Sequence, residues 1–401
     1  MATSAGVGLC TDPESLSAAR TAARAALERA GVPVADWALV FMTSPHRPQF
    51  AGMLAEIQKT LGTQMITGCS ASGVLTGSEE VEGRPAVAVL AVRSDTMRAS
   101  TFFVSLGEND PKNAAREMAR QIGAAPPGLM ILLPDPFAAR PDHLLHEVGR
   151  SNPEREAVGA AASADAELRG TFQFYGRNVA GKAVTGLHLS GDLRRAIGIT
   201  QGCQPLGPQA RITSGDGNVI LEVDGRPALD VLRSRLPGPL ADSLGMLGGH
   251  LFVGLPPDPL QEEIVPGEYL VRNLVAVDAG RGALIVGATV RPNEPLYFVL
   301  REGHAAREDL KEMLRRVDRE AGGSRRFGLY FNCAARGSSL YGMPGIDTAY
   351  ISSAFGDLPI IGFFGNAEIA PLRGRNHLFT HTGVLSLIGD RDTQSAPADG
   401  V

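Results

Sequence analysis

A cysteine and an arginine stand close together in the run NCAARG at residues 332–337, directly after an apolar segment. If that segment is a strand, both side chains lie at its carboxyl end, where open α/β sheets bind ligands. Arg336 suits a carboxylate or phosphate through paired hydrogen bonds, and its charge can make the Cys333 thiol reactive by lowering its pKa. The competing interpretations are a buried small hydrophobe for Cys333 and a surface ion pair for Arg336.

Small and hydroxyl-bearing residues form a second candidate, the run GCSASG at residues 68–73. Small residues such as Gly68 and Cys69 let a backbone approach a ligand, and the hydroxyls of Ser70 and Ser72 can donate hydrogen bonds. The run does not meet the Gly-x-Ser-x-Gly pattern of a nucleophile elbow, and no helical pattern follows it at once. We interpret it as a ligand-lining turn, with a plain tight turn as the alternative.

Two more pairs of polar residues complete the candidate site. Asn366 and Glu368 follow a third apolar segment, and the Glu368 carboxylate can face the amine of a zwitterionic ligand, unless it belongs to a solvated turn. Arg272 and Asn273 interrupt an apolar strand pattern. An unpaired buried charge is costly, so Arg272 must face either a cleft or solvent.

Metal and cofactor sites have no support in the sequence. His143 and His146 are one turn apart and His377 and His381 are four residues apart, but neither pair has the additional ligands of a known metal site. The four cysteines include no CxxC pair, and the chain has no P-loop and no Gly-x-Gly-x-x-Gly run. We therefore expect neither a metal nor a cofactor.

Composition excludes two classes of partner. The 401 residues carry a net charge of −5 and only 5% aromatic residues, so the electrostatic footprint of a nucleic-acid binder is missing. No apolar run approaches the ~20 residues of a membrane span, and residues 1–10 lack the basic and apolar regions of a signal peptide. The sequence predicts a cytoplasmic protein, and its excess of arginine over lysine with abundant alanine and glycine indicates a bacterial one.

The elements that must position these side chains recur three times along the chain. Each copy reads as strand, helix, strand, turn and strand. The spacing from the first strand to a turn glycine is 29, 30 and 33 residues, counted from Leu39 to Gly68, Leu129 to Gly159 and Leu329 to Gly362. A unit of this size cannot bury both faces of its strands, so the copies should share sheets. Coincidence is the alternative, since strand–helix–strand runs are common.

We therefore predict an α/β (α+β) fold in which mixed sheets are flanked by helices. It is built from the repeated strand-helix-strand-turn-strand units, arranged in two halves. The expected divisions are an N-terminal helix within 1–34, a first domain at 35–225, a second at 226–389 and a disordered polar tail at 390–401.

Taken together and in order, the motifs resemble the FIST family, whose name stands for F-box and intracellular signal transduction. Residues 35–225 resemble the FIST N-terminal domain and residues 226–389 the FIST C-terminal domain. The resemblance covers about residues 35–390 and is carried by GCS at 68–70, LLPD at 132–135, VGA at 158–160, LEVDGRPA at 221–228, LVRN at 270–273, NCAARG at 332–337, and GFF at 362–364 through EIAP at 368–371.

The resemblance implies a sensory ligand-binding module in intracellular signal transduction, with small molecules such as amino acids as ligands and no established catalysis. The sequence departs from the family at three positions. Val74 replaces the acid of Gly-Cys-Ser-x-x-Gly-Glu, and Ala367 and Ala370 replace both glycines of Gly-Glu-Ile-Gly-Pro. If those glycines let the backbone meet a ligand, the added methyl groups narrow the site, and binding is retuned or lost.

Three functions follow as hypotheses. In the first, Arg336 and Arg272 take the anion of a small ligand, Ser70 and Asn366 add hydrogen bonds, and Glu368 takes a cation. No kinase, cyclase or methyl-accepting segment follows, so a separate signalling protein would carry the output. The second is an enzyme that uses Cys333 or a serine, which needs a base nearby. The third is a protein-interaction scaffold without a ligand, and the oligomeric state stays open.

Overall fold

The chain folds into two compact units, which we describe separately. The computed structural model describes residues 3–106, 110–138, 141–151, 155–164, 170–236, 238, 249–265 and 267–391. The first unit comprises residues 1–200, 310–378 and 382–401, and the second comprises residues 201–309 and 379–381. Residues 392–401 of the expected tail lie outside the described residues.

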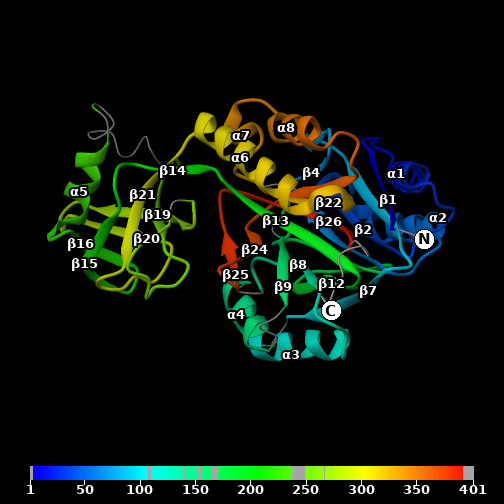
Figure 1. The fold of residues 1–401 in the computed structure, drawn as a ribbon, viewed down its shortest axis with the longest axis horizontal. Helices are drawn as coiled ribbons and strands as arrows, with labels where there is room; N and C mark the ends of the chain where they lie inside the picture. The colour runs from blue at the N-terminus through cyan, green and yellow to red at the C-terminus, as the bar shows by residue number, and fades with distance from the viewer. Residues whose placement is uncertain are drawn as a thin grey trace, which may run out of the picture. The chain divides into compact units, whose positions relative to one another are not determined.

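Three copies of one topology make up the first unit (Figure 1). The first copy consists of β1 (Ser4–Cys10), α1 (Ser15–Ala30), β2 (Trp37–Thr43), a 3-10 helix (Ser44–Gln49), α2 (Phe50–Leu61), β3 (Ile66–Ala71), the hairpin β4 (Gly73–Thr76) and β5 (Glu80–Glu82), and β6 (Val87–Arg93). The second consists of β7 (Met97–Ser105), α3 (Pro111–Ile122), β8 (Leu129–Pro134), α4 (Pro141–Ser151), β9 (Glu156–Ala160), the hairpin β10 (Gln173–Tyr175) and β11 (Asn178–Ala180), and β12 (Ala183–Gly191).

The third copy is interrupted after its first strand by the second unit. It consists of β13 (Leu193–Gln201), α6 (Gly303–Ala321), a 3-10 turn (Gly322–Ser324), β22 (Arg325–Cys333), the short α7 (Ser338–Tyr341), α8 (Ile346–Phe355), β23 (Ile360–Gly365), the hairpin β24 (Glu368–Leu372) and β25 (Arg375–Phe379), and β26 (Thr382–Asp390). The predicted repetition of strand–helix–strand units is confirmed, and each copy extends one strand and one helix further upstream than expected.

Every sheet of the first unit takes its last two strands from a different copy. The strand orders are β1-β6-β2-β3-β10-β11, β7-β12-β8-β9-β24-β25 and β13-β26-β22-β23-β4-β5. The second and third strands of each copy pair in parallel, as β2 with β3, β8 with β9 and β22 with β23. The hairpin of the first copy pairs in the sheet of the third copy, that of the second copy in the sheet of the first, and that of the third copy in the sheet of the second. The three sheets are therefore connected in a closed ring.

Helices cover the outer face of each sheet, α1 and α2 on the first, α3 and α4 on the second, and α6 and α8 on the third (Figure 1). Apolar residues at helical spacing in the sequence predict the buried face of two of these helices. All of them are buried: Phe50, Met53, Leu54, Ile57 and Leu61 of α2, and Leu310, Met313, Leu314 and Val317 of α6. Aromatic rings pack between the sheets. Phe41 of β2 contacts Phe363 of β23 at 4.6 Å and Phe331 of β22 at 6.5 Å between ring centroids.

The three repeated glycines lie inside strands and not in turns, which corrects the sequence-based expectation. Gly68, Gly159 and Gly362 occupy the same position in β3, β9 and β23. A Cβ at each would overlap the carbonyl oxygen of the residue paired with it on the parallel neighbour, which is Val40, Leu132 and Tyr330 respectively. Each glycine therefore allows the close approach of two backbones within a sheet.

Several strands were not predicted from the sequence. β1 precedes the expected first helix, and β24 occupies the segment read as a turn around Glu368. β13 was also not expected, although Ala196, Gly198 and Thr200 are buried in alternation. These three residues are small or polar, so they carry little of the hydrophobic periodicity on which such predictions depend.

The described residues of the second unit form an antiparallel sheet and one helix. Its elements are β14 (Cys203–Pro205), β15 (Ala210–Asp216), β16 (Val219–Val223), β17 (Arg226–Pro227), α5 (Ala228–Arg235), β18 (Leu251–Leu255), β19 (Leu270–Asp278), β20 (Ala283–Val286) and β21 (Pro295–Arg301). The apolar runs at 269–278 and 282–290, joined by the turn AGR at 279–281, predict a hairpin, and β19 and β20 pair antiparallel there.

We expect Gly68→Ala, Gly159→Ala and Gly362→Ala each to destabilise the fold by about 1–3 kcal/mol, because the methyl group forces two paired strands apart. Denaturant unfolding of the three variants measures this loss. Gly149→Ala is the matched control, since its Cβ meets open space on α4 and alanine favours a helix by ~1 kcal/mol. Wild-type stability in all three strand variants would contradict the role given to these glycines.

Candidate functional site

The ends of β3, β9 and β23 meet within the first unit. Ser72, Ser163 and Asn366 each stand four residues after a repeated glycine. The Ser72 amide donates to Ser163 Oγ at 2.8 Å, and Ser163 Oγ donates to the Phe364 carbonyl. Asn366 Nδ2 donates to the Ala162 carbonyl at 2.8 Å. The three copies thus contribute equivalent polar residues to one point.

Accessibility differs among these three residues. Ser163 is buried, Ser72 is half-buried and Asn366 is exposed, so the junction of the strand ends reaches the surface. Ser163 was not among the residues expected to form the site. Its signal was present, because it lies at the same offset from its glycine as Ser72 and Asn366 do from theirs.

The remaining residues of the run at 68–73 are internal. Gly68 packs against the backbone of β2, and burial raises the pKa of the Cys69 thiol well above its usual value, which makes that thiol unreactive. Ser70 Oγ donates to the Ser163 carbonyl at 2.9 Å and accepts from the Phe172 amide at 3.0 Å. Ser70 therefore ties the junction to neighbouring backbone.

A buried polar cluster lies beside the junction in the third copy, and Asp347 of α8 is its centre. Arg336 Nε and Nη2 each donate to one Asp347 oxygen at 3.2 Å. Tyr330, Asn332 and Tyr341 donate to the same carboxylate at 2.8, 3.0 and 2.7 Å. Arg336 and these donors hold the pKa of Asp347 below its ordinary value despite complete burial. Arg336 is thus half of a buried ion pair, and the interpretation as a surface pair is wrong.

Two glutamates from the hairpin β4–β5 fix the helices that carry this cluster. Glu80 accepts from the amides of Gly345 at 2.8 Å and Thr348 at 3.1 Å, at the start of α8. Glu82 accepts from the amide and hydroxyl of Ser338 at 3.1 and 2.9 Å, at the start of α7. Carboxylates at helix N-termini satisfy amides that have no partner within the helix.

Glu368 is buried in strand β24, so the alternative of a solvated turn carboxylate is wrong. Its Oε2 accepts from the Thr382 amide at 3.3 Å and hydroxyl at 2.8 Å. Burial raises the pKa of Glu368 to about 8, and the hydrogen bonds from Thr382 and Cys333 and the charge of Arg336 oppose that rise. Cys333 and Arg336 are therefore both neighbours of Glu368.

Two atoms of this cluster have unused hydrogen-bonding capacity. Arg336 Nη1 and Glu368 Oε1 are buried, and neither has a hydrogen-bond partner among the described residues. A buried polar atom without a partner costs about 1–3 kcal/mol, so such atoms normally contact a water or a ligand.

Arg272 and Asn273 belong to the second unit. Arg272 is half-buried on β19, and its Nη1 donates to the Val271 carbonyl at 2.8 Å. Asn273 is exposed, with its Oδ1 3.4 Å from His381 Nε2. Within this unit they form a polar group of their own.

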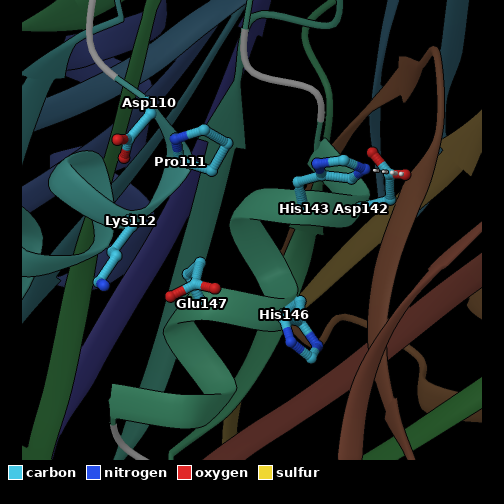
Figure 2. A pocket seen from close by; sticks show the side chains of 7 residues that line it. All are labelled: Asp110, Pro111, Lys112, Asp142, His143, His146 and Glu147. Carbon is cyan, nitrogen blue, oxygen red and sulfur yellow. Dashed lines mark ion pairs between the residues drawn. The ribbon is translucent and has the colours of Figure 1, made fainter.

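Two hollows on the first unit contain none of the candidate residues. Figure 2 shows the first, of about 380 Å³, between the start of α3 and α4, where His143 lies 3.7 Å from Asp142. The second, of about 440 Å³, has the amide side chains of Gln58, Gln64 and Asn178 and the ring of Tyr175 in its lining. No three histidine, cysteine or acidic residues in the described ranges are grouped so that they would hold a metal ion.

Comparison with known proteins identifies the family. The model of the FIST N domain matches residues 36–226 and that of the FIST C domain matches residues 228–371. The chain therefore belongs to the FIST family, whose domains are sensory domains associated with signalling. No helix within the described ranges is long and apolar enough to cross a bilayer.

Relatives of the same length exist in mycobacteria. The chain is 30% identical to the uncharacterized protein Rv0628c of Mycobacterium tuberculosis over 96% of this chain and 99% of that protein. It is 28% identical to the uncharacterized protein Mb0898c of Mycobacterium bovis, over 96% and 98% respectively. Among solved structures, a cyanuric acid hydrolase aligns over 97% of this chain and all of its own at 12% identity, with a TM-score of 0.35. A likeness this weak does not bear on function.

We expect Asp347→Ala to destabilise the fold by about 3–5 kcal/mol, because it leaves the Arg336 charge buried without its counter-ion. Denaturant unfolding of the variant gives the loss directly. Arg120→Ala, which removes the exposed ion pair with Glu117, is the control and should leave stability unchanged. Equal effects in the two variants would contradict the central place of Asp347.

Glu368 should make the fold less stable as pH rises. Its pKa is about 8 in the folded protein against an ordinary value of 4.5, so between those values the folded state binds more protons than the unfolded state. Stability therefore falls across this window. Unfolding free energies of wild type and Glu368→Gln from pH 4.5 to 8.5 isolate the effect, and their difference should shrink or reverse with rising pH. A constant difference would show that Glu368 does not titrate in this window.

Proposed function

We propose that this protein is a sensory module that binds a small molecule where the strand ends of the first unit meet. The observation that carries this proposal is the pair of unused atoms, Arg336 Nη1 and Glu368 Oε1, buried in one cluster. An arginine N–H and a carboxyl oxygen are complementary to a ligand that presents an acceptor and a donor. An amino acid has both, and another small carboxylate supplies the acceptor.

Electrostatics support an anionic group on the ligand. Asp347 offsets the charge of Arg336 but occupies only its Nε and Nη2, so Nη1 has no acceptor among the described residues. Within a buried site such a charge-assisted hydrogen bond is about twice as strong as a neutral one. A ligand ammonium beside Glu368 would favour the ionised carboxylate, as Arg336 already does.

In this proposal the ligand enters at the junction of the strand ends. Asn366 is exposed there and Ser72 is half-buried, so both can contact a ligand as it enters. The family's glycines are replaced at this point by Ala367 and Ala370, which are both buried. Their methyl groups reduce the space beside Glu368 and favour a compact ligand.

The signal would leave through a separate protein in the cytoplasm. Ligand binding changes the population of two states only if its affinity for the two differs. A ligand that contacts both Arg336 and Glu368 would link the segment after β22 to β24. It would therefore bind more tightly to the state in which these two segments are close together.

Thermal-shift screening with amino acids and small carboxylates tests the proposal. We expect at least one class to raise the Tm of the wild type, and Asn366→Ala and Glu368→Gln to reduce that shift. Asn366 is exposed, so its truncation should leave the fold intact.

The matched control is His146→Ala in the separate hollow of Figure 2. It should retain the full shift of the wild type. A hit that shifts Asn366→Ala and Glu368→Gln as much as the wild type would place the binding site elsewhere.

A further inference from the structure

The second strand of each copy ends at the same position with a different residue. Met42, Pro134 and Asn332 pair with the beginning of the last strand of their copies, which is β6, β12 and β26 respectively. The next residues along the chain are Thr43, Asp135 and Cys333. Three different side chains therefore occupy the equivalent backbone position in the three copies.

The first two side chains are hydrogen-bonded to neighbouring groups, most of them backbone. Thr43 Oγ1 donates to the carbonyl of Arg84 at 3.0 Å and accepts from the Ala86 amide at 2.7 Å. Asp135 accepts from the amides of Phe137 and Ala138 and from the Thr171 hydroxyl. Both residues are structural.

Cys333 has a different environment. It is 4% exposed, and its thiol donates a hydrogen bond to Glu368, whose Oε2 is held by Thr382. By the register of β22 and β26, Thr382 stands opposite Cys333. A nucleophile, a base within hydrogen-bond reach and a third group that orients the base are the arrangement of an activated nucleophile.

The comparison with Cys69 shows that burial alone does not produce this arrangement. Cys69 is completely buried, and burial is the single cause that raises the pKa of its thiol. Cys333 instead has a carboxyl group as partner and the Arg336 guanidinium nearby, with Nη1 unused. The interpretation of Cys333 as a small hydrophobe does not account for those polar neighbours.

We propose that Cys333 is a base-assisted nucleophile that adds reversibly to the carbonyl carbon of a small 2-oxo acid or aldehyde. Glu368 serves as the base, Thr382 orients it, and Arg336 Nη1 binds the ligand oxygen. The proposal rests on the proposed function in that both use the same site, and it narrows the ligand to a compound with an electrophilic carbonyl group.

The step requires no further reactant. The Glu368 carboxylate takes the thiol proton, and a sulfur electron pair forms the S–C bond. The π pair of the carbonyl moves to its oxygen, which Arg336 Nη1 stabilises by a hydrogen bond. That oxygen then takes the proton from Glu368 and becomes a hydroxyl group, which completes the hemithioacetal and restores the Glu368 carboxylate.

The other carboxylates near the reacting atoms each have a partner of their own. Asp347 is paired with Arg336, and Glu80 and Glu82 are bound to the starts of α8 and α7. Glu368 is therefore the carboxyl group that meets the thiol. A pKa near the working pH is what a general base needs, and that of Glu368 is about 8.

Labelling of the full-length protein with iodoacetamide, followed at each cysteine by mass spectrometry between pH 6 and 9, tests the nucleophile. We expect Cys333 to be labelled at least about tenfold more slowly in Glu368→Gln than in the wild type, since general bases contribute factors of about 10²–10⁴. Thr382→Val should give a smaller decrease. Half-buried Cys10 is the internal control, with the same rate in all three proteins.

Glyoxylate is the probe for the carbonyl step. It should slow the labelling of Cys333 but not of Cys10, and ¹³C-labelled glyoxylate should give a hemithioacetal signal with wild type that is absent with Cys333→Ser. Equal labelling of Cys333 in wild type and Glu368→Gln, or no labelling of it in the folded protein, would overturn the proposal. So would glyoxylate without effect on a reactive Cys333.

Failure here is distinguishable from failure of the proposed function. If amino acids raise the Tm of Cys333→Ser as much as that of the wild type while Cys333 is unreactive, the sensory site stands and the covalent step falls. In the opposite case, Cys333 is labelled more slowly in Glu368→Gln than in the wild type, but no amino acid or small carboxylate other than glyoxylate raises the Tm. The covalent step is then supported, and the proposal that the site binds amino acids and small carboxylates in general is wrong.

Discussion

The exchange of hairpins among the three sheets is the constraint on which the rest of the first unit depends. The hairpin β4–β5 completes the sheet of the third copy, β10–β11 that of the first, and β24–β25 that of the second. No copy therefore contains a whole sheet, and each one buries its strand edges only when the ring closes. The same closure brings the ends of β3, β9 and β23 to one point, where Ser72, Ser163 and Asn366 are connected by hydrogen bonds through side chains and backbone.

Hairpin exchange also builds the buried cluster of the third copy. Glu80 and Glu82 arrive on β4–β5 and hold the starts of α8 and α7, and α8 carries the Asp347 that binds Arg336. Glu368 arrives on β24, the strand that pairs with β9 of the second copy. Groups from the first and third copies thus meet around the end of β22. A site assembled in this way is sensitive to how the copies pack, which is what a sensory module requires.

The three copies differ in the side chain at the end of their second strand, which is where we propose the nucleophile. At the end of the second strand, Thr43 and Asp135 use their side chains to satisfy backbone groups, while Cys333 faces a carboxyl group. The ring keeps the backbone common to the three copies, so a change of side chain in one copy costs the others little. One copy can therefore hold reactive groups while the other two maintain the frame.

The sequence by itself determined the features that depend on neighbours along the chain. These are the apolar faces of α2 and α6, the threefold recurrence of its glycines, the association of Cys333 with Arg336, and the family. Only the tertiary structure decided that Gly68, Gly159 and Gly362 lie inside strands, that Glu368 is buried, that Ser163 joins the junction, and that Asp347 is the partner of Arg336. The physical reason is that hydrophobic periodicity is local, whereas these contacts depend on strand register and on which sheet receives each hairpin. Register joins Ser72 to Ser163 across 91 residues, a separation that leaves no periodic trace in the sequence.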